Sequence, residues 1–396
     1  MQVFPLISRA KDAAIKQPVE LTSYSRNDKG EIKLDDSELK YYYLPDSDVS
    51  TPGGIDLASG IKEFKQSGSL GTEFEGLLLS IEDYEKNKNG GKKIDSNLIT
   101  WRGLLRKIMT LPFSRNEELE YNIIVFDGQI MMVEDLEFSQ NLKLKEEAEM
   151  DEFKRKLIYS GYKFEQITTL SKPWALSTRN EIEKRRKIPV KNNIPQYTTV
   201  VSTGIGGIKL TIGAEVDCVW NYKPNLEEGD KENPLNHYVE LKTNSIINHP
   251  KSLFAFENKL FRTWAQCFLV GTPKIIVGFR DENMILRSVE EYETEKIPIL
   301  IKNNTFQSDN NNGGNGGKKN VPKFMPSIKF LGGFLAWLNE NIPKDDENRA
   351  WKLKYNSETN KDYLVLTEMT PEQAIKFTNP DTGLVSKKFR DWRMKN

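Results

Sequence analysis

The chain has 396 residues, of which 37% are hydrophobic and 29% are charged, and its mean hydropathy is −0.59. It has no run of about 20 apolar residues and no basic segment followed by an apolar stretch at its start, so we expect neither a membrane span nor a secretory signal. The 57 Lys and Arg residues balance 57 Asp and Glu residues. This net charge of zero excludes a protein that coats nucleic acid through its overall field, so any nucleic acid must bind in a local basic channel.

Cysteine and histidine are too scarce for two common kinds of stabilising site. The chain contains only Cys218, Cys267, His237 and His249. A structural zinc site needs about four such ligands and a disulfide framework needs more cysteines, so we expect neither, and we expect a reducing compartment. Any metal chemistry must then depend on carboxylates.

The hydrophobic pattern predicts a single domain over residues 1–396 with one insertion. Residues 303–320 are low-complexity Asn and Gly, and periodic patterns resume at Phe324, so this stretch is an insertion and not a domain boundary. In chain order we expect a helix at 97–110, a hairpin at 121–134, a strand edge at 162–165, a hairpin at 198–220, a strand at 237–244, a helix at 253–269 and a hairpin at 274–290. Helices among many short strands indicate an α+β (mixed α/β) fold, with twisted mixed β-sheets and flanking helices.

Two carboxylates follow each other at alternate positions in the second hairpin. If residues 210–218 form one strand, Glu215 and Asp217 point to the same face, opposite the apolar residues that alternate with them. Paired carboxylates on one face are suitable ligands for a divalent metal. Taken alone, such a pair is more often an ordinary solvated strand face.

The next strand carries Glu240 and Lys242, which also share one face. An acid on one strand followed by Glu-x-Lys on another is the pattern of PD-(D/E)xK nucleases, in which acids hold metal and the lysine orients water and offsets phosphate charge. The tripeptide alone says little, because Glu-x-Lys occurs six times in the chain. Its strand context and the Glu215/Asp217 pair upstream single out Glu240, and a DNA endonuclease of this class remains one interpretation.

Three further candidates have ordinary explanations when each is taken alone. Glu165 follows an alternating pattern and could be an exposed acid, while Gln266 lies on a polar stripe of the 253–269 helix with Lys259 and Arg262. Arg102 could be a common salt-bridge partner.

Five short motifs nevertheless occur together in one order: TWRG at 100–103, GYKFE at 161–165, GAEVDC at 213–218, YVELKT at 238–243 and WAQCFLVG at 264–271. The set resembles the DXO decapping-nuclease family of RNA 5′-end quality control. Overall resemblance and the Asn-rich insertion make the chain similar to the fungal branch that partners the nuclear 5′→3′ exoribonuclease. The resemblance implies a core like that of PD-(D/E)xK nucleases.

The resemblance also implies a function and a set of site residues. One or two Mg²⁺ or Mn²⁺ ions would be held by Glu165, Glu215, Asp217, Glu240 and the main-chain carbonyl of Leu241. Glu165, Lys242 and Gln266 would act at the scissile phosphate and the attacking water, and Arg102 would contact RNA phosphates. The implied protein is a nuclear hydrolase that releases pyrophosphate from 5′-triphosphate RNA and removes incomplete or non-canonical caps. A mainly non-catalytic subunit that stabilises the exoribonuclease is the alternative.

Overall fold

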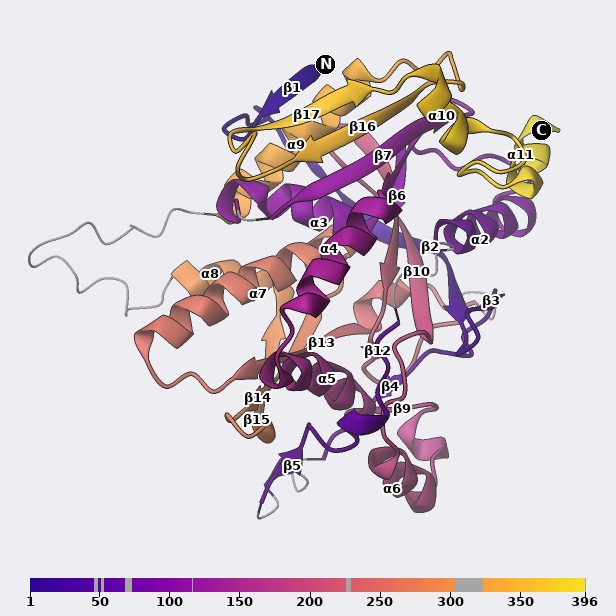
Figure 1. The fold of residues 1–396 in the computed structure, drawn as a ribbon. Helices are drawn as coiled ribbons and strands as arrows, with labels where there is room; N and C mark the ends of the chain where they lie inside the picture. Colours follow the sequence, from indigo (N-terminus) through magenta and orange to yellow (C-terminus); the bar gives the residue numbers. More distant parts are fainter. Residues whose placement is uncertain are drawn as a thin grey trace, which may run out of the picture.

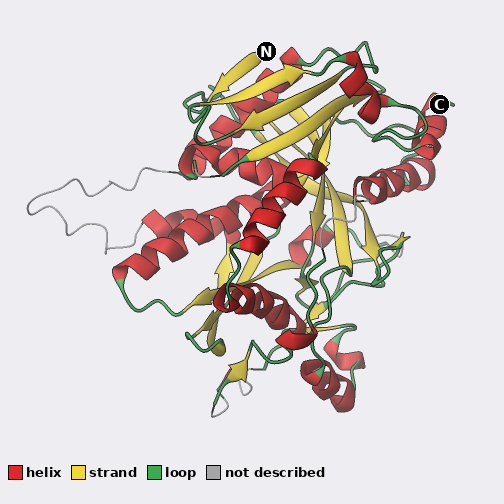
Figure 2. Cartoon of the chain, in the orientation of Figure 1, coloured by secondary structure: helices red, strands yellow, loops and turns green. Residues whose placement is uncertain are grey.

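The structure is a computed structural model, which describes residues 1–45, 49–50, 53–67, 73–115, 117–225, 229–302 and 323–395. The predicted insertion at 303–320 lies outside these residues. Within them, the strands form two mixed sheets and the helices pack between and around the sheets, which confirms the predicted α+β class (Figures 1 and 2).

The larger sheet has ten strands in the described residues and contains both parallel and antiparallel pairs. In spatial order they are β1 (Gln2–Pro5), β17 (Tyr363–Glu368), β16 (Ala350–Tyr355), β7 (Leu119–Phe126), β8 (Gln129–Glu134), β6 (Leu98–Trp101), β11 (Ile208–Glu215), β10 (Gln196–Ile205), β2 (Ile15–Arg26) and β3 (Ile32–Lys33). The smaller sheet runs β5 (Ile55–Asp56), β15 (Ile285–Glu293), β14 (Lys274–Arg280), β13 (Tyr238–Ser245), β12 (Cys218–Val219), β4 (Tyr41–Tyr42) and β9 (Thr169–Leu170).

The helices of the described residues are α2 (Glu73–Asn87), α3 (Arg102–Thr110), α4 (Leu136–Ala148), α5 (Glu152–Ile167), α6 (Arg179–Lys187), α7 (Pro250–Val270), α8 (Ile297–Lys302), α9 (Phe324–Asn341), α10 (Pro371–Thr378) and α11 (Lys387–Met394). Among them we find none that is long and apolar enough to cross a membrane.

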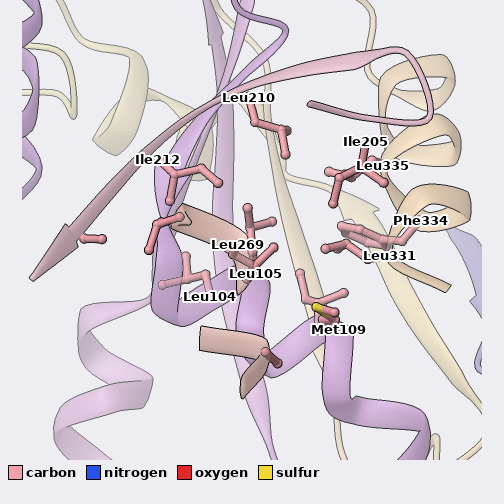
Figure 3. Packing of buried hydrophobic residues seen from close by; sticks show 14 of the residues in the cluster. Leu104, Leu105, Met109, Ile205, Leu210, Ile212, Leu269, Leu331, Phe334 and Leu335 are labelled. Carbon is pink, nitrogen blue, oxygen red and sulfur yellow. The ribbon is translucent and has the colours of Figure 1, made fainter. Parts of the chain in front are cut away.

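The main core lies where α3, α7 and α9 meet the two sheets. Leu105 and Met109 of α3 are fully buried and lie with Leu331 of α9 and Leu269 of α7 in one cluster (Figure 3). Because α3 and α7 are fixed by this core, the polar side chains at their edges have defined positions.

Three predicted hairpins are confirmed, and tight turns explain two of them. β7 and β8 join through Asp127 and Gly128, which both have positive φ angles, 49° and 70°. β10 and β11 join through Gly206 and Gly207, at 60° and 84°. Two consecutive residues with positive φ form the turn type that matches the twist of a hairpin, and glycine adopts positive φ without strain.

Candidate active site

Arg102 is the first residue of α3 and follows β6 directly. The prediction of a continuous helix over 97–110 was therefore wrong in its first turn, because Leu98–Trp101 form a strand. Both neighbours of this strand, β8 and β11, run parallel to it. A fully buried strand shows no alternation, so a short apolar run of this kind cannot be assigned from periodicity alone. The junction places Arg102, with 7% of its surface exposed, at the end of the strand.

Glu215 is the last residue of β11, and Asp217 lies beyond the strand. The prediction that they share one strand face was wrong, because the chain leaves the large sheet here and Cys218 already pairs with β13 in the small sheet. The buried Val216 and Cys218 continue the apolar alternation through the crossing, which hides the change of sheet in the sequence. The site thus lies where the two sheets meet.

Glu240 on β13 is the centre of a hydrogen-bond network that joins several elements. Its side chain is 2% exposed. Oε1 accepts hydrogen bonds from Lys242 Nζ on the same strand and from Gln266 Nε2 on α7, the latter at 2.9 Å. Oε2 accepts one from Arg102 Nη1 at 3.1 Å. Three predicted residues, Lys242, Gln266 and Arg102, therefore meet at the buried carboxylate of Glu240, and the four come from three separate motifs.

The charges in this network stabilise one another against the cost of burial. Burial alone would raise the pKa of Glu240, but Lys242 and Arg102 outweigh it, so the pKa is lowered. Burial would lower the pKa of Lys242 and of Arg102, but Glu240 outweighs it and both pKa values are raised. All three groups are ionised at neutral pH, which gives the site two fixed cations beside an anion.

Glu165 lies near the C-terminal end of α5, so the prediction of a strand edge at 162–165 was wrong. Asp151 caps the helix by accepting a hydrogen bond from the backbone N–H of Lys154. The buried residues of the helix recur at helical spacing: Tyr159, Ser160, Lys163, Phe164 and Ile167. A four-residue window cannot distinguish this period from alternation, whereas the sixteen residues of the helix can.

Burial and neighbouring carboxylates raise the pKa values of two acids at the site. The pKa of Glu165 is raised to about 7, first by burial and then by Glu215 and Glu240, against the effect of Lys40 and Lys242. The pKa of Asp217 is raised well above its usual value by burial and by the other three acids, Glu240 first. Asp217 Oδ2 also accepts a hydrogen bond from the backbone N–H of Leu241 at 2.7 Å.

This acid cluster fits a divalent cation by its chemistry. Its donors are hard carboxylate oxygens, and a cation would relieve the repulsion that raises the two pKa values. In the part of the chain that the structure describes, no three His, Cys, Asp or Glu side chains are already arranged to hold a metal. The carboxylate of Glu240 accepts hydrogen bonds from Lys242, Gln266 and Arg102 in this arrangement.

A cavity of about 540 Å³ opens beside the network. Arg102, Glu215 and Gln266 lie in its lining, together with apolar side chains from distant parts of the sequence. These include Trp101, Tyr24, Phe74, Phe377 and Leu384. A space of this size, lined by both apolar and charged side chains, is typical of a small-ligand site and too small for a nucleic acid duplex.

Sequence reasoning missed two charged residues near the site. Lys40 acts on the charge of Glu165, and Arg280 ends β14 beside the carboxyl end of β13. The only available signal for Arg280 was an arginine that closes an apolar strand. That signal needs the parallel pairing of β13 with β14, which the sequence does not reveal.

Comparisons with known proteins agree with this geometry. The family described as RAI1 like PD-(D/E)XK nuclease matches residues 16–389. The protein named Decapping nuclease RAI1 from Debaryomyces hansenii is 41% identical over 406 residues, which cover 100% of this chain and 98% of the relative.

Two solved structures are similar over the full chain. The crystal structure of Candida albicans Rai1 in complex with pU5-Mn²⁺ has a TM-score of 0.89 and 39% identity, covering 100% of this chain and 99% of that one. Scheffersomyces stipitis Rai1 in complex with (3′-NADP)⁺ and calcium ion has a TM-score of 0.88 and 35% identity, with both chains fully covered. The chain therefore belongs to the RAI1-like PD-(D/E)XK nuclease family, and it is an enzyme of the decapping-nuclease class.

Proposed function

We propose that the protein hydrolyses RNA 5′ ends with the help of a divalent metal, Mg²⁺ or Mn²⁺. The observation that carries this proposal is the network in which Glu240 accepts hydrogen bonds from Lys242, Gln266 and Arg102, with Asp217 bonded to the backbone of Leu241, beside a cavity of about 540 Å³. The reactions are release of pyrophosphate from 5′-triphosphate RNA and removal of incomplete or non-canonical caps. The Mn²⁺, calcium, pU5 and 3′-NADP complexes of its relatives support both the metal and the nucleotide substrate.

The acids would hold the metal, and the nearby donors would handle the substrate. Glu165, Glu215, Asp217, Glu240 and the carbonyl of Leu241 are the proposed ligands. A bound divalent cation supplies Lewis-acid activation of phosphate and water. Lys242, Gln266 and Arg102 lie together around Glu240 and would donate hydrogen bonds to phosphate oxygens of the substrate.

The direct test is hydrolysis of RNAs that differ only at the 5′ end. Matched single-stranded RNAs with triphosphate, unmethylated cap, complete cap or dinucleotide cap are incubated with Mn²⁺, and the released products are identified. We expect pyrophosphate from the first and cap release from the incomplete and dinucleotide forms. Cleavage of plasmid DNA with none of these products would contradict the proposal and indicate a DNA endonuclease.

The size of the cavity also predicts the form of the substrate. A single-stranded 5′ end fits, whereas a blunt duplex is too wide to bring its terminal phosphates to Arg102 and Gln266. The same 5′-triphosphate RNA, alone or annealed to a complementary strand, provides the comparison. Equal rates on both would show that the site is open.

We further propose, from the family resemblance, that the protein acts in the nucleus beside a 5′→3′ exoribonuclease. A partner needs an exposed patch of about 800 Å² on each side, whereas Glu240 is buried. Association should therefore survive substitution of the proposed metal ligands. Pull-down of the exoribonuclease by the wild type and by Asp217→Asn tests this, and loss of the partner from a folded variant would contradict it.

A further inference from the structure

A second group of cations lies next to the candidate active site, outside the cavity. Lys259 on α7 donates a hydrogen bond from Nζ to the backbone carbonyl of Thr243, the residue that follows Lys242. Arg262 lies one turn further along α7, four residues before Gln266, and is exposed. Arg280 ends β14, beside Ser245 at the end of the parallel strand β13.

Acids balance the positive charges of this group only in part: burial lowers the pKa of Arg280, and Asp281 acts against that effect. Burial lowers the pKa of Lys259 to about 8, together with the positive charges of Lys242, Arg280 and Arg262. The acid next in sequence to Arg280 is Asp281, which accepts from Arg287 at 2.9 Å and from two backbone N–H groups. Cations held together without a full counter-charge repel one another, and an anion between them removes that cost.

Arg280 provides a second observation that points to a ligand. Only 6% of its surface is exposed, and Nη1 donates to Ser245 Oγ at 3.3 Å. Its Nε is buried and has no hydrogen-bond partner among the described residues. A buried charged donor left without an acceptor is costly, because it has lost water and gained nothing in return.

We propose that Lys259, Arg262 and Arg280 form a second phosphate site, which binds the RNA backbone on the 3′ side of the scissile phosphate. This inference rests on the proposed function, because it assigns the 5′ end to the cavity. The cavity has room for only one or two nucleotides, and none of the three cations lines it. The rest of the strand must leave the site, and the adjoining surface is the exposed face of α7, where Arg262 has no ion pair within the described part of the chain.

The position of the group favours a continuous strand over an unconnected anion. Four helical residues separate Arg262 from Gln266, a rise of about 6 Å, and Lys259 touches the residue next to Lys242. The second site is therefore one short step from the groups that would handle the scissile phosphate. Arginine forks and lysine ammonium groups are the side chains that bind phosphate oxygens.

The test combines substitutions in the protein with RNAs in which one backbone phosphate has lost its charge. Fluorescence anisotropy measures the Kd of single-stranded 5′-triphosphate RNAs in chelator, each with a methylphosphonate at one of the first three linkages. We expect one linkage to weaken wild-type binding about tenfold, and Arg262→Ala to weaken binding of the unmodified RNA by a similar factor. The two losses should not add, since both remove the same contact. Arg262→Lys should restore most of the affinity.

The matched control is Lys361→Ala, which removes an exposed cation from the turn between β16 and β17 in the large sheet. Losses that add at every linkage, or an equal loss in the control, would overturn the inference. Hydrolysis of the unmodified RNA by the wild type with Mn²⁺ is measured separately. If the RNA is hydrolysed but the two losses of affinity add, only the second phosphate site is rejected. If the losses of affinity do not add but no hydrolysis occurs, only the proposed reaction is rejected.

Discussion

The carboxyl group of Asp217 has two roles that one substitution separates. It accepts the backbone N–H of Leu241, and its charge is repelled by the neighbouring acids. Asp217→Asn keeps an acceptor oxygen and removes the charge, so we expect hydrolysis to fall by more than about 100-fold while the melting temperature in chelator rises. Melting curves with EDTA and rates with Mn²⁺ measure the two effects. A drop in melting temperature would show that the charge itself stabilises the fold.

Glu20 is a buried acid outside the site and gives a prediction about pH. Its Oε2 accepts hydrogen bonds from Thr199 Oγ1 at 2.7 Å and from the hydroxyl of Tyr238, and Lys223 Nζ lies 3.7 Å from Oε1. Burial raises the pKa of Glu20 above 4.5 more than these neighbours lower it. The unfolded chain then loses this proton at a lower pH than the folded one, so the contribution of Glu20 to the free energy of unfolding decreases as pH rises above 4.5.

Glu20→Gln should remove that dependence. The stability of the variant relative to the wild type should therefore increase with pH above 4.5, as measured by urea unfolding at several pH values. Glu282→Gln, at an exposed position, is the control and should show no such trend. A relative stability of Glu20→Gln that stays flat across this range would mean that the folded and unfolded pKa values are equal.

Among the elements, α5 is placed by a glycine in the strand that it covers. A Cβ added to Gly278 of β14 would lie 2.5 Å from the ring of Phe164, the neighbour of Glu165. We expect Gly278→Ala to displace α5, to lower the free energy of unfolding by about 1–3 kcal/mol and to reduce hydrolysis by moving Glu165. Chemical denaturation and rates with Mn²⁺ measure both.

Gly161 provides the matched substitution, since an added Cβ would meet nothing within 4 Å there. It lies inside α5, so Gly161→Ala should stabilise the protein by about 0.5–1 kcal/mol through helix propensity. Equal effects of the two substitutions would show that the distance between α5 and β14 does not place Glu165.

Elements with a local signal could be predicted from the sequence. For some elements, the hydrophobic period and the residues that end it lie within about 20 residues of sequence. These elements are the turns at Asp127-Gly128 and Gly206-Gly207, the strand that carries Glu240 and Lys242, and the helix that carries Gln266. Their side chains were therefore assigned to the correct elements. Their meeting at Glu240 followed only from the family resemblance, because no local pattern encodes a contact between distant segments.

The errors at Leu98–Trp101 and at Asp217 arise because buried residues hide a change of structure, whereas the error at Glu165 arises from a window of only four residues. β6 is covered on both faces, so Leu98–Trp101 could not be distinguished from the first turn of a helix. The chain changes sheets between Glu215 and Cys218 without any break in the apolar alternation. The pairing of Arg280 with the end of β13 depends on a parallel neighbour that only the tertiary structure supplies.

At the scale of the whole molecule, balanced charge limits how salt affects RNA binding. With a net charge of zero, only local contacts release counter-ions, and the proposed sites engage about three phosphates. A plot of log affinity against log salt should have a slope of about −2, from about −0.7 for each phosphate on a single strand. Anisotropy titrations from low to physiological salt measure it. A much steeper slope would indicate that RNA is bound along an extended surface.

The passage of the chain between sheets at Val216 and Asp217 has a mechanical consequence. Glu215 belongs to the larger sheet and Glu240 to the smaller one. An ion bound by both residues would link two sheets that are each held together by their own backbone hydrogen bonds. A ligand at about 100 times its Kd adds about 2.7 kcal/mol to the free energy of unfolding. With Mn²⁺, amide hydrogens in β11 and β13 should become protected together, whereas in EDTA they should open separately. If the amide exchange rates in β11 and β13 are the same with Mn²⁺ and with EDTA, no ion links the two sheets.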